Sequence, residues 1–363
     1  MMAKRKVLVT GASGVVGMGA VRHFAETDGW DVTGVSRRLP PPIKGAELNS
    51  LDLLDRKRCE EVFGQMADVT DVVFAALNEK PGLFEGWQDR QQMEINLTML
   101  RNTLEPLEAV AKNLNHISLL QGTKAYGVHL GPIAIPARER SPRHQHENFY
   151  FLQEDYLRTR QQGKRWHWTV WRPQLVIGEA IGANLNVIPP LGVYAAIRRE
   201  AGLPLCFPGG DPFVFEMVDT DLLGKAYEWA AGASTARNEI FNITNGDVFV
   251  WQELWPAIAD AFGMRPGPHE PVMLSQELLH GAEQWASIVR KYNLAAPTDL
   301  KTFIGESIHV VDFAMGCGMS DRPPILVSTV KLRQAGFHDC IDSEDMMRKW
   351  IKRYQEARLL PPV

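Results

Sequence analysis

The stretch Thr10-Gly11-Ala12-Ser13-Gly14-Val15-Val16-Gly17 decides how the first half of this chain is interpreted. It follows a short apolar run, Val7 to Val9, and it opens a segment with helical spacing, Val15 to Glu26. In a G-x-x-G-x-x-G turn the first glycines let the backbone approach a pyrophosphate, and the last lets the helix pack close to the strand. The N-terminus of such a helix offers N–H groups and a positive dipole end to phosphates. The residues of this turn predicted to bind a dinucleotide are Gly11, Ser13, Gly14, Val15, Val16 and Gly17.

Strand-like and helix-like segments alternate along the first half of the chain. Helical spacing is found over residues 15–26 and 95–112. Strands separated by helices of this length form right-handed crossovers within a parallel sheet. We therefore predict the α/β class, with a Rossmann doubly wound parallel sheet and a smaller, mostly helical substrate-binding lobe. The segments predicted as strands are residues 7–9, 31–35, 71–76, 116–120 and 168–171.

The chain is predicted to divide into two parts. A nucleotide-binding domain is expected over residues 1–178, with a return to it at about 215–245. The substrate-binding lobe is expected to comprise residues 179–214 and 246–363. Both parts have room for a core of their own, since 363 residues exceed what one small domain needs.

The second half has its own local signals. Residues 203–213 are rich in Pro and Gly and are predicted as a loop. Trp251, Trp255 and Phe262 recur at helical spacing, which favours a place in the core. Phe207, Phe213 and Phe215 either line a substrate cavity or simply pack. The helices predicted in this half are residues 189–199, 251–262, 275–292 and 343–357.

Composition narrows the functional classes. The net charge of −4 and the lack of a long Lys/Arg run argue against a nucleic-acid or anionic-membrane surface. No apolar stretch approaches the roughly 20 residues that a spanning helix needs. The four cysteines are scattered without C-x-x-C pairing, which argues against a zinc cage and a disulfide framework. We expect a soluble, cytoplasmic protein without a metal.

The end of the second predicted strand indicates which dinucleotide binds. An NAD enzyme usually places a carboxylate there for the ribose 2′-hydroxyl, but this chain has Ser36-Arg37-Arg38. A carboxylate would repel a 2′-phosphate, whereas arginine binds one through its planar fork. The sequence therefore predicts NADPH, with an exposed basic turn as the alternative explanation for Arg37 and Arg38.

Further residues of the predicted cofactor site follow the third and fourth strands. Asp52 is positioned to face the adenine, with Leu53 beside it, unless Asp52 instead caps the next helix. Ala75 ends the fourth strand with a small side chain that leaves room for the adenosine ribose. These residues extend the cofactor site along one edge of the predicted sheet.

The catalytic residues do not follow the usual short-chain dehydrogenase pattern. That pattern is a Tyr and a Lys four residues apart on one helix, and no tyrosine of this chain has a lysine four residues later. Lys124 follows the fifth strand, in Gly122-Thr123-Lys124-Ala125-Tyr126. Tyr150 opens a later helix, in Asn148-Phe149-Tyr150-Phe151-Leu152-Gln153-Glu154-Asp155. Both positions are expected at the carboxyl edge of the sheet, where the nicotinamide should lie.

These two motifs resemble the progesterone 5β-reductase/iridoid synthase-like family, an atypical branch of the extended short-chain dehydrogenases. Its members carry the catalytic lysine in TG-x-K-x-Y and the catalytic tyrosine in N-F-Y-x-x-x-E-D. Residues 122–126 match the first motif with Gly and Thr exchanged, and residues 148–155 match the second. The resemblance implies catalytic roles for Tyr150 and Lys124. The other residues expected at the cofactor are Gln121, Tyr150, Pro173 and Val176.

The resemblance implies NADPH-dependent 1,4-reduction of an enone, with a small apolar substrate and a monomeric or homodimeric enzyme. This chain departs from the plant pattern at Phe151, where a second tyrosine is common. It also has Gly127-Val128-His129-Leu130 where a His and a Gly-Pro-Phe are common. These departures affect the substrate pocket and therefore the identity of the substrate.

Two other functions remain open from the sequence. An NAD-dependent nucleotide-sugar epimerase or dehydratase would share the fold, and a non-catalytic NADP-binding sensor would keep the glycine turn. Tyr150 could also be a buried aromatic residue, and Lys124 a solvated loop residue. His129, His144 and His146 lack metal-site spacing and are expected in a surface loop.

Overall fold

The computed structural model describes residues 4–80, 85–319 and 322–363. The chain forms two compact units. The first unit comprises Met1–Gln174, Thr220–Ile243 and Val327–Asp339. The second comprises Leu175–Asp219, Thr244–Leu326 and Cys340–Val363. Each unit has a core of its own and is described separately below.

A seven-stranded parallel sheet forms the centre of the first unit, in the order β11-β6-β5-β4-β1-β2-β3. This confirms the predicted Rossmann sheet. Order and register place β1 between β2 and β4. The chain therefore builds the sheet outward from β1 to β2 and β3 on one side, and then to β4, β5, β6 and β11 on the other. Ligands of such sheets bind outside the carboxyl ends of the strands at the point where the direction reverses. The strands are β1 (Arg5–Thr10), β2 (Trp30–Ser36), β3 (Ala46–Ser50), β4 (Asp71–Phe74), β5 (His116–Leu120), β6 (His167–Pro173) and β11 (Glu239–Ile243).

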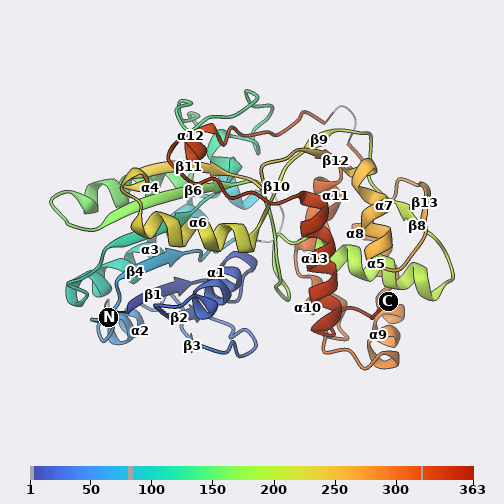
Figure 1. Ribbon diagram of the computed structural model, residues 1–363, viewed down its shortest axis with the longest axis horizontal. Helices are drawn as coiled ribbons and strands as arrows, with labels where there is room; N and C mark the ends of the chain where they lie inside the picture. Colours follow the sequence, from blue (N-terminus) through green and yellow to red (C-terminus); the bar gives the residue numbers. More distant parts are fainter. Residues whose placement is uncertain (1–3, 81–84, 320–321) are drawn as a thin grey trace. The chain divides into compact units, whose positions relative to one another are not determined.

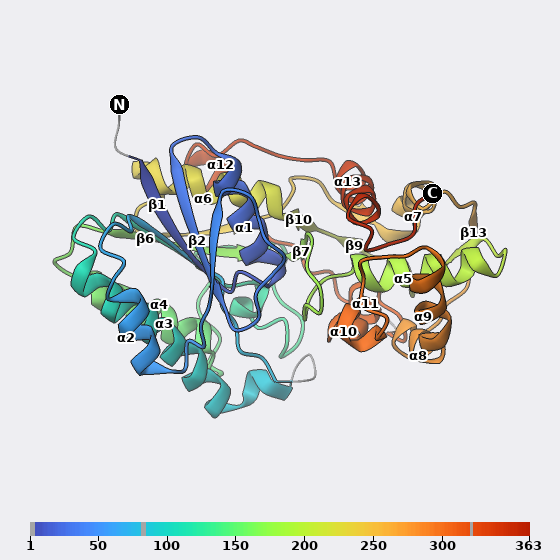
Figure 2. The same ribbon diagram turned by 90° about the horizontal axis from the view of Figure 1, so that it is seen from below.

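Helices cover both faces of this sheet, as Figures 1 and 2 show. On one face α1 packs against α6, and on the other α3 lies between α2 and α4. Both faces of the strands are therefore apolar, and Val7, Leu8 and Val9 are fully buried. The helices are α1 (Val15–Glu26), α2 (Arg56–Phe63), α3 (Arg90–Val110), α4 (Phe149–Gln161), α6 (Thr220–Gly232) and α12 (Val330–Gln334), with short 3-10 helices at Glu85–Gln88, Thr123–Tyr126 and Ser234–Ala236.

The second unit is mostly helical. Its core contains the predicted residues Trp251, Trp255 and Phe262, which confirms their assignment. Phe207 and Phe215 also lie in this core, so they pack rather than line a cavity. The helices are α5 (Ile188–Glu200), α7 (Trp251–Ala261), α8 (Leu274–His280), α9 (Ala282–Lys291), α10 (Leu300–Ile304), α11 (Ser307–Ala314) and α13 (Ser343–Glu356). Three two-stranded sheets are formed by β7 (Leu175–Ile177) with β10 (Met217–Asp219), β9 (Val214–Phe215) with β12 (Phe249–Val250), and β8 (Leu205–Phe207) with β13 (Pro266–His269).

Three local predictions differ from the structure. The predicted loop at 203–213 contains β8, because a distant strand, β13, supplies its hydrogen-bonding partner. The predicted helix at 275–292 is two helices that meet at Gly281, where a β-carbon would lie 2.6 Å from Ile197 Cδ1. Residues 327–339 were assigned to the substrate lobe, but they belong to the first unit, where Ser328 N–H donates to the Ala137 carbonyl.

Membrane-spanning candidates were sought among the described helices. None of them is both long enough and apolar enough to cross a bilayer.

Candidate active site

The glycine turn between β1 and α1 leaves no room for side chains. Gly11 has a φ of +74°, and a β-carbon there would lie 2.7 Å from the Ala75 carbonyl oxygen. A β-carbon on Gly17 would lie 2.2 Å from the Gly11 carbonyl oxygen. Gly14 precedes α1, whose first turn has no acidic residue and no capping side chain. This helix N-terminus therefore suits a phosphate.

The end of β2 lies against the glycine turn. The N–H groups of Gly11 and Ala12 donate to the Val35 carbonyl at 2.9 and 3.1 Å. Arg37 and Arg38 follow directly and are exposed. Their backbone is held by two hydroxyl groups, because Ser36 Oγ donates to the Arg38 carbonyl and Ser50 Oγ to the Arg37 carbonyl. Two guanidinium groups therefore lie at the sheet edge that carries the glycine turn.

The residues after β3 and β4 complete this edge. Asp52 accepts a hydrogen bond from the Leu54 N–H at 3.0 Å, and it does not cap a helix. The cap of α2 is Asp55, which accepts from the Arg58 N–H, so the capping alternative for Asp52 is wrong. Leu53 is buried in the core of the unit, and Ala75 contributes the carbonyl that lies closest to Gly11.

Asn148 connects the segments that carry Tyr150 and Lys124. It caps α4, because its Oδ1 accepts from the Tyr150 N–H at 3.0 Å. Its Nδ2 donates to the Lys124 carbonyl, also at 3.0 Å. The buried Gln121 donates to the Tyr150 carbonyl at 2.9 Å. The Asn148 side chain therefore fixes the start of α4 against the turn that follows β5.

The Lys124 ammonium group is enclosed by two side chains that the sequence analysis did not select. Its Nζ lies 3.2 Å from Glu79 Oε1 and 3.9 Å from the ring centroid of Trp87. Trp87 Nε1–H donates to the same Glu79 oxygen at 2.6 Å. Burial lowers the pKa of Lys124, and the Glu79 carboxylate opposes that shift. Lys124 is thus a buried cation with a partner, and the solvated-loop alternative is wrong.

Tyr150 lies in an aromatic cluster beside this ion pair. Its ring centroid is 5.1 Å from that of Trp87 and 4.6 Å from that of Phe149. Burial raises the pKa of the Tyr150 phenol; the Glu79 charge raises it further, while Arg172 opposes the shift. A β-carbon on Gly122 would lie 3.5 Å from the hydroxyl oxygen, an ordinary van der Waals contact. Tyr150 is therefore a buried aromatic residue and also a phenol that stays protonated.

The helix that carries Tyr150 is anchored by the Glu of its motif. Glu154 pairs with Arg172 of β6 at 2.6 Å, and the side chains are only 1% and 4% exposed. Arg143 pairs with the second Glu154 oxygen at 2.7 Å. Arg172 also lies 5.0 Å from the ring centroid of Tyr126, whose hydroxyl donates to Asn242 Oδ1. These contacts join α4, β6 and β11 beneath the site.

The three histidines differ from the surface loop that was expected. His129 lies 5.7 Å from His144 and 6.3 Å from His146 between ring centroids, and 5.7 Å from Trp87. All three are half-buried. Burial lowers the pKa of His129 to about 4, with smaller effects from His144 and Lys124. Within the described part of the chain, no group of His, Cys, Asp and Glu is arranged to hold a metal ion.

Comparison with known proteins identifies the family to which these features belong. The model of the PRISE-like Rossmann-fold domain matches residues 50–304, which include Lys124, Tyr150 and Glu79. This chain belongs to the PRISE-like family.

Curated relatives of this PRISE-like chain match nearly its whole length. The (S)-8-oxocitronellyl enol synthase of Catharanthus roseus is 31% identical over 99% of this chain and 93% of its own length. The enzyme of the same name from Antirrhinum majus is 29% identical over 98% of this chain and 92% of its own. The 3-oxo-Δ4,5-steroid 5β-reductase of Arabidopsis thaliana is 30% identical over 98% and 92%. The chain is thus an oxidoreductase of the extended short-chain dehydrogenase type.

Solved structures share the fold at lower identity. WbmH of Bordetella bronchiseptica, in complex with NAD+, has a TM-score of 0.64 and 18% identity, covering 97% of this chain and 98% of its own. The UDP-glucose 4-epimerase of Thermus thermophilus, in complex with NAD, has a TM-score of 0.65 and 18% identity, covering 97% and 99%. At these identities the match demonstrates the Rossmann architecture and nothing about substrate.

The structure brings most of the predicted residues of the PRISE-like site to one edge of the first unit. Pro173 ends β6, and its carbonyl oxygen would lie 3.6 Å from a β-carbon on Gly122. Val176 belongs to β7 in the second unit. Glu79 and Trp87 were missed. The sequence offers one indication for Glu79, which is a polar residue shortly after the carboxyl end of a strand. It offers no indication that Trp87 belongs to the site.

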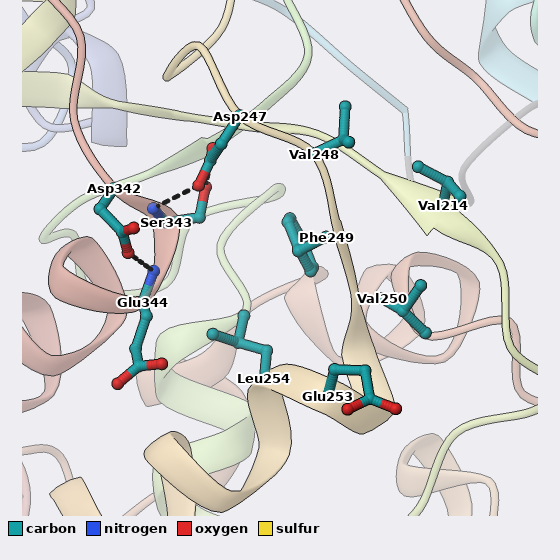
Figure 3. A pocket seen from close by; sticks show the side chains of 10 residues that line it. All are labelled: Val214, Asp247, Val248, Phe249, Val250, Glu253, Leu254, Asp342, Ser343 and Glu344. Carbon is teal, nitrogen blue, oxygen red and sulfur yellow. Dashed lines mark hydrogen bonds between the residues drawn. The ribbon is translucent and has the colours of Figure 1, made fainter.

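The second unit has a pocket of its own, shown in Figure 3. Ser343 closes one side, because its N–H and Oγ both donate to the Asp247 carboxylate, at 2.9 and 2.7 Å. Asp342 caps the following turn by accepting from the Glu344 N–H. The pocket is lined by Val214, Asp247, Val248, Phe249, Val250, Glu253, Leu254, Asp342, Ser343 and Glu344. It combines an apolar side with four carboxylates and has no basic residue in its lining.

Proposed function

We propose that this protein reduces the C=C bond of an enone by 1,4-addition of hydride from NADPH. The observation that carries the proposal is the placement of Tyr150 and Lys124 together with Glu79 and Trp87 beside the carboxyl ends of β4 and β5. The relatives named for steroid 5β-reduction and for 8-oxocitronellyl enol synthesis support the same class of reaction.

The residues of the first unit fit a dinucleotide. Gly11 and Gly17 lie where a β-carbon would meet backbone, so their turn can lie directly against a pyrophosphate. The N-terminus of α1 attracts the phosphates through its free N–H groups. Arg37 and Arg38 favour NADPH over NADH, since a guanidinium group binds a 2′-phosphate and no carboxylate follows β2 to repel it.

The chemistry of the chain's own residues is electrostatic. When bound, NADPH would supply a hydride to the β-carbon of the enone; the resulting enolate would then take one proton from solvent at its α-carbon to give the saturated ketone. Tyr150, held as a neutral phenol, donates a hydrogen bond to the substrate carbonyl oxygen, where negative charge develops. Lys124 contributes a positive charge from its enclosed position next to Trp87. Because these groups are already in place, they need little reorganisation when the enolate forms.

The surroundings of Tyr150 favour a small apolar substrate. The side chains packed around it form a buried apolar cluster, which excludes water from the reacting oxygen and strengthens the hydrogen bond. The members of the cluster are Trp87, Met93, Ala125, Phe149, Tyr150 and Phe151.

The test is NADPH oxidation with a panel of simple and steroidal enones, followed at the NADPH absorbance band. We expect oxidation that depends on the enone, with one saturated carbonyl product per NADPH identified by mass spectrometry. The saturated ketones of the same skeletons serve as controls and should give no oxidation. Tight NADPH binding without turnover would instead indicate a sensor, and bound NAD in the purified protein would indicate an epimerase.

Arg37→Ala should reduce the preference for NADPH. A hydrogen bond to a charged group contributes about 1.5–3 kcal/mol, so the ratio of NADPH to NADH affinity should fall about ten- to hundredfold. Titration of cofactor fluorescence measures both affinities. Arg38→Ala is measured in parallel. Arg165→Ala is the control, because Arg165 is exposed and precedes β6, at the amino edge of the sheet, whereas Arg37 follows β2 at the carboxyl edge. An unchanged ratio in Arg37→Ala would remove the assignment of the 2′-phosphate to Arg37.

A further inference from the structure

Glu79 is a buried carboxylate that contacts Lys124 of the proposed catalytic pair. Its side chain is 5% exposed, although it lies on a loop that follows β4. A carboxylate leaves water at a cost of several kcal/mol unless hydrogen bonds and an opposite charge replace the water. Trp87 and Lys124 both supply this replacement at one atom, Oε1. Glu79, Trp87 and Lys124 therefore restrain one another's positions.

The contacts of Glu79 determine where the Lys124 ammonium group lies. The indole N–H of Trp87 donates to Glu79, and the face of the same indole lies 3.9 Å from Lys124 Nζ. Lys124 is therefore bound by a carboxylate on one side and an aromatic face on the other. A lysine side chain has four rotatable bonds, and these two contacts restrain them and so help to define the position of its charge.

Glu79 also favours the charged form of Lys124. A buried lysine without a counter-charge becomes neutral, because burial disfavours the ammonium form. A neutral Lys124 would give no electrostatic stabilisation to an enolate. Burial is the main cause that raises the pKa of Tyr150, and the Glu79 charge adds to it. Glu79 therefore acts mainly on Lys124, whose charged form it favours.

We propose that Glu79 is a positioning residue for this reaction: together with Trp87 it holds the Lys124 ammonium group beside Tyr150. This inference rests on the proposed function. It assigns to the loop after β4 a role that Tyr150 and Lys124 cannot fulfil by themselves, because neither of them supplies a negative charge.

Other titratable and charged groups face the pair from the neighbouring elements. Arg172 of β6 acts on Tyr150 and is itself paired with Glu154. The His129 ring centroid lies 5.7 Å from that of Trp87, and burial lowers the pKa of His129 to about 4, so it is neutral at and above neutral pH. His144 lies against the backbone of Lys124 and 3.5 Å from Asn148 Nδ2, and the His146 ring centroid is 6.4 Å from that of His144. The alkaline limit of the reaction should therefore report Lys124.

The test is the pH dependence of kcat/KM in Glu79→Gln, which keeps the shape and the acceptor oxygen but removes the charge. An opposite charge within hydrogen-bonding distance shifts a pKa by about one to three units. We expect the alkaline limb to move to lower pH by about that amount, with a fall in kcat and little change in KM. Glu79→Asp retains the carboxylate and should move the limb back towards its wild-type position.

A second readout does not need an enone. The acetylation of Lys124 by acetic anhydride, followed by peptide mass spectrometry across pH, should show its midpoint moving down in Glu79→Gln. The control is Glu147→Gln, an exposed carboxylate near Tyr150 in sequence that pairs with Arg90. If Glu79→Gln misfolds, Trp87→Phe removes the indole donor and leaves a smaller aromatic ring beside Lys124, so it should move the midpoint in the same direction.

The outcomes are distinct. A wild-type labelling midpoint in folded Glu79→Gln would overturn this inference, even if the protein reduces enones. Absence of enone turnover in the wild-type protein would overturn the proposed function, and the labelling midpoint would still report whether Glu79 controls Lys124.

Discussion

Replacement of Tyr150 by phenylalanine is expected to lower kcat about a hundred- to a thousandfold, because it removes one donor aimed at the developing enolate oxygen. The ring would remain packed against Trp87 and Phe149, so the site should keep its shape. The N–H of residue 150 would still donate to Asn148, and its carbonyl would still accept from Gln121. NADPH affinity should fall much less than kcat, because the hydroxyl is only one of the groups expected at the cofactor. Steady-state kinetics with a reactive enone and a cofactor titration measure both quantities.

Tyr156→Phe is the matched control for this substitution. Tyr156 lies on the same helix, and its buried hydroxyl has no hydrogen-bond partner among the described residues. Removal of that hydroxyl should leave kcat unchanged, which separates loss of the catalytic hydroxyl from a general disturbance of α4. Near-normal turnover in folded Tyr150→Phe would contradict the proposed role of the phenol.

Substitution of Gly17 by alanine should severely weaken cofactor binding. The new β-carbon would lie 2.2 Å from the Gly11 carbonyl oxygen, so the turn and α1 must separate. Overpacking of this kind costs about 1–3 kcal/mol. If that cost falls on the cofactor-binding conformation, the Kd for NADPH rises about ten- to hundredfold. Isothermal titration calorimetry measures the Kd, and thermal unfolding shows whether the fold survives.

Two other glycines provide a graded comparison. A β-carbon on Gly14 would lie 3.4 Å from the Gly11 carbonyl oxygen, so Gly14→Ala should raise the Kd less than Gly17→Ala does. Gly232, at the end of α6, has no atom within 4 Å of its β-carbon position and should tolerate alanine without effect. Wild-type affinity in folded Gly17→Ala would show that this turn does not carry the dinucleotide.

Local sequence patterns predicted the elements on which these expectations depend. The glycine turn, the helix over residues 15–26 and the strand over residues 116–120 are found where the spacing indicated. Parallel β-α repeats bury both faces of their strands, and this produces continuous apolar runs that are visible without a structure. Lys124 was selected because it follows the fifth strand, whereas Tyr150 was selected because it opens a helix within the motif of residues 148–155.

Only the tertiary structure decided what surrounds those two residues. Glu79 and Trp87 lie on a segment with no regular pattern, and the contact between Glu79 and Lys124 joins parts of the chain 45 residues apart. The division of 275–292 into two helices and the pairing of β8 with β13 also depend on distant neighbours. The sequence determined which side chains lie at the carboxyl edge of the sheet, since periodicity and turn chemistry are local. Packing determined which of these side chains are in contact, because the residues that surround a buried charge come from segments far apart in the sequence.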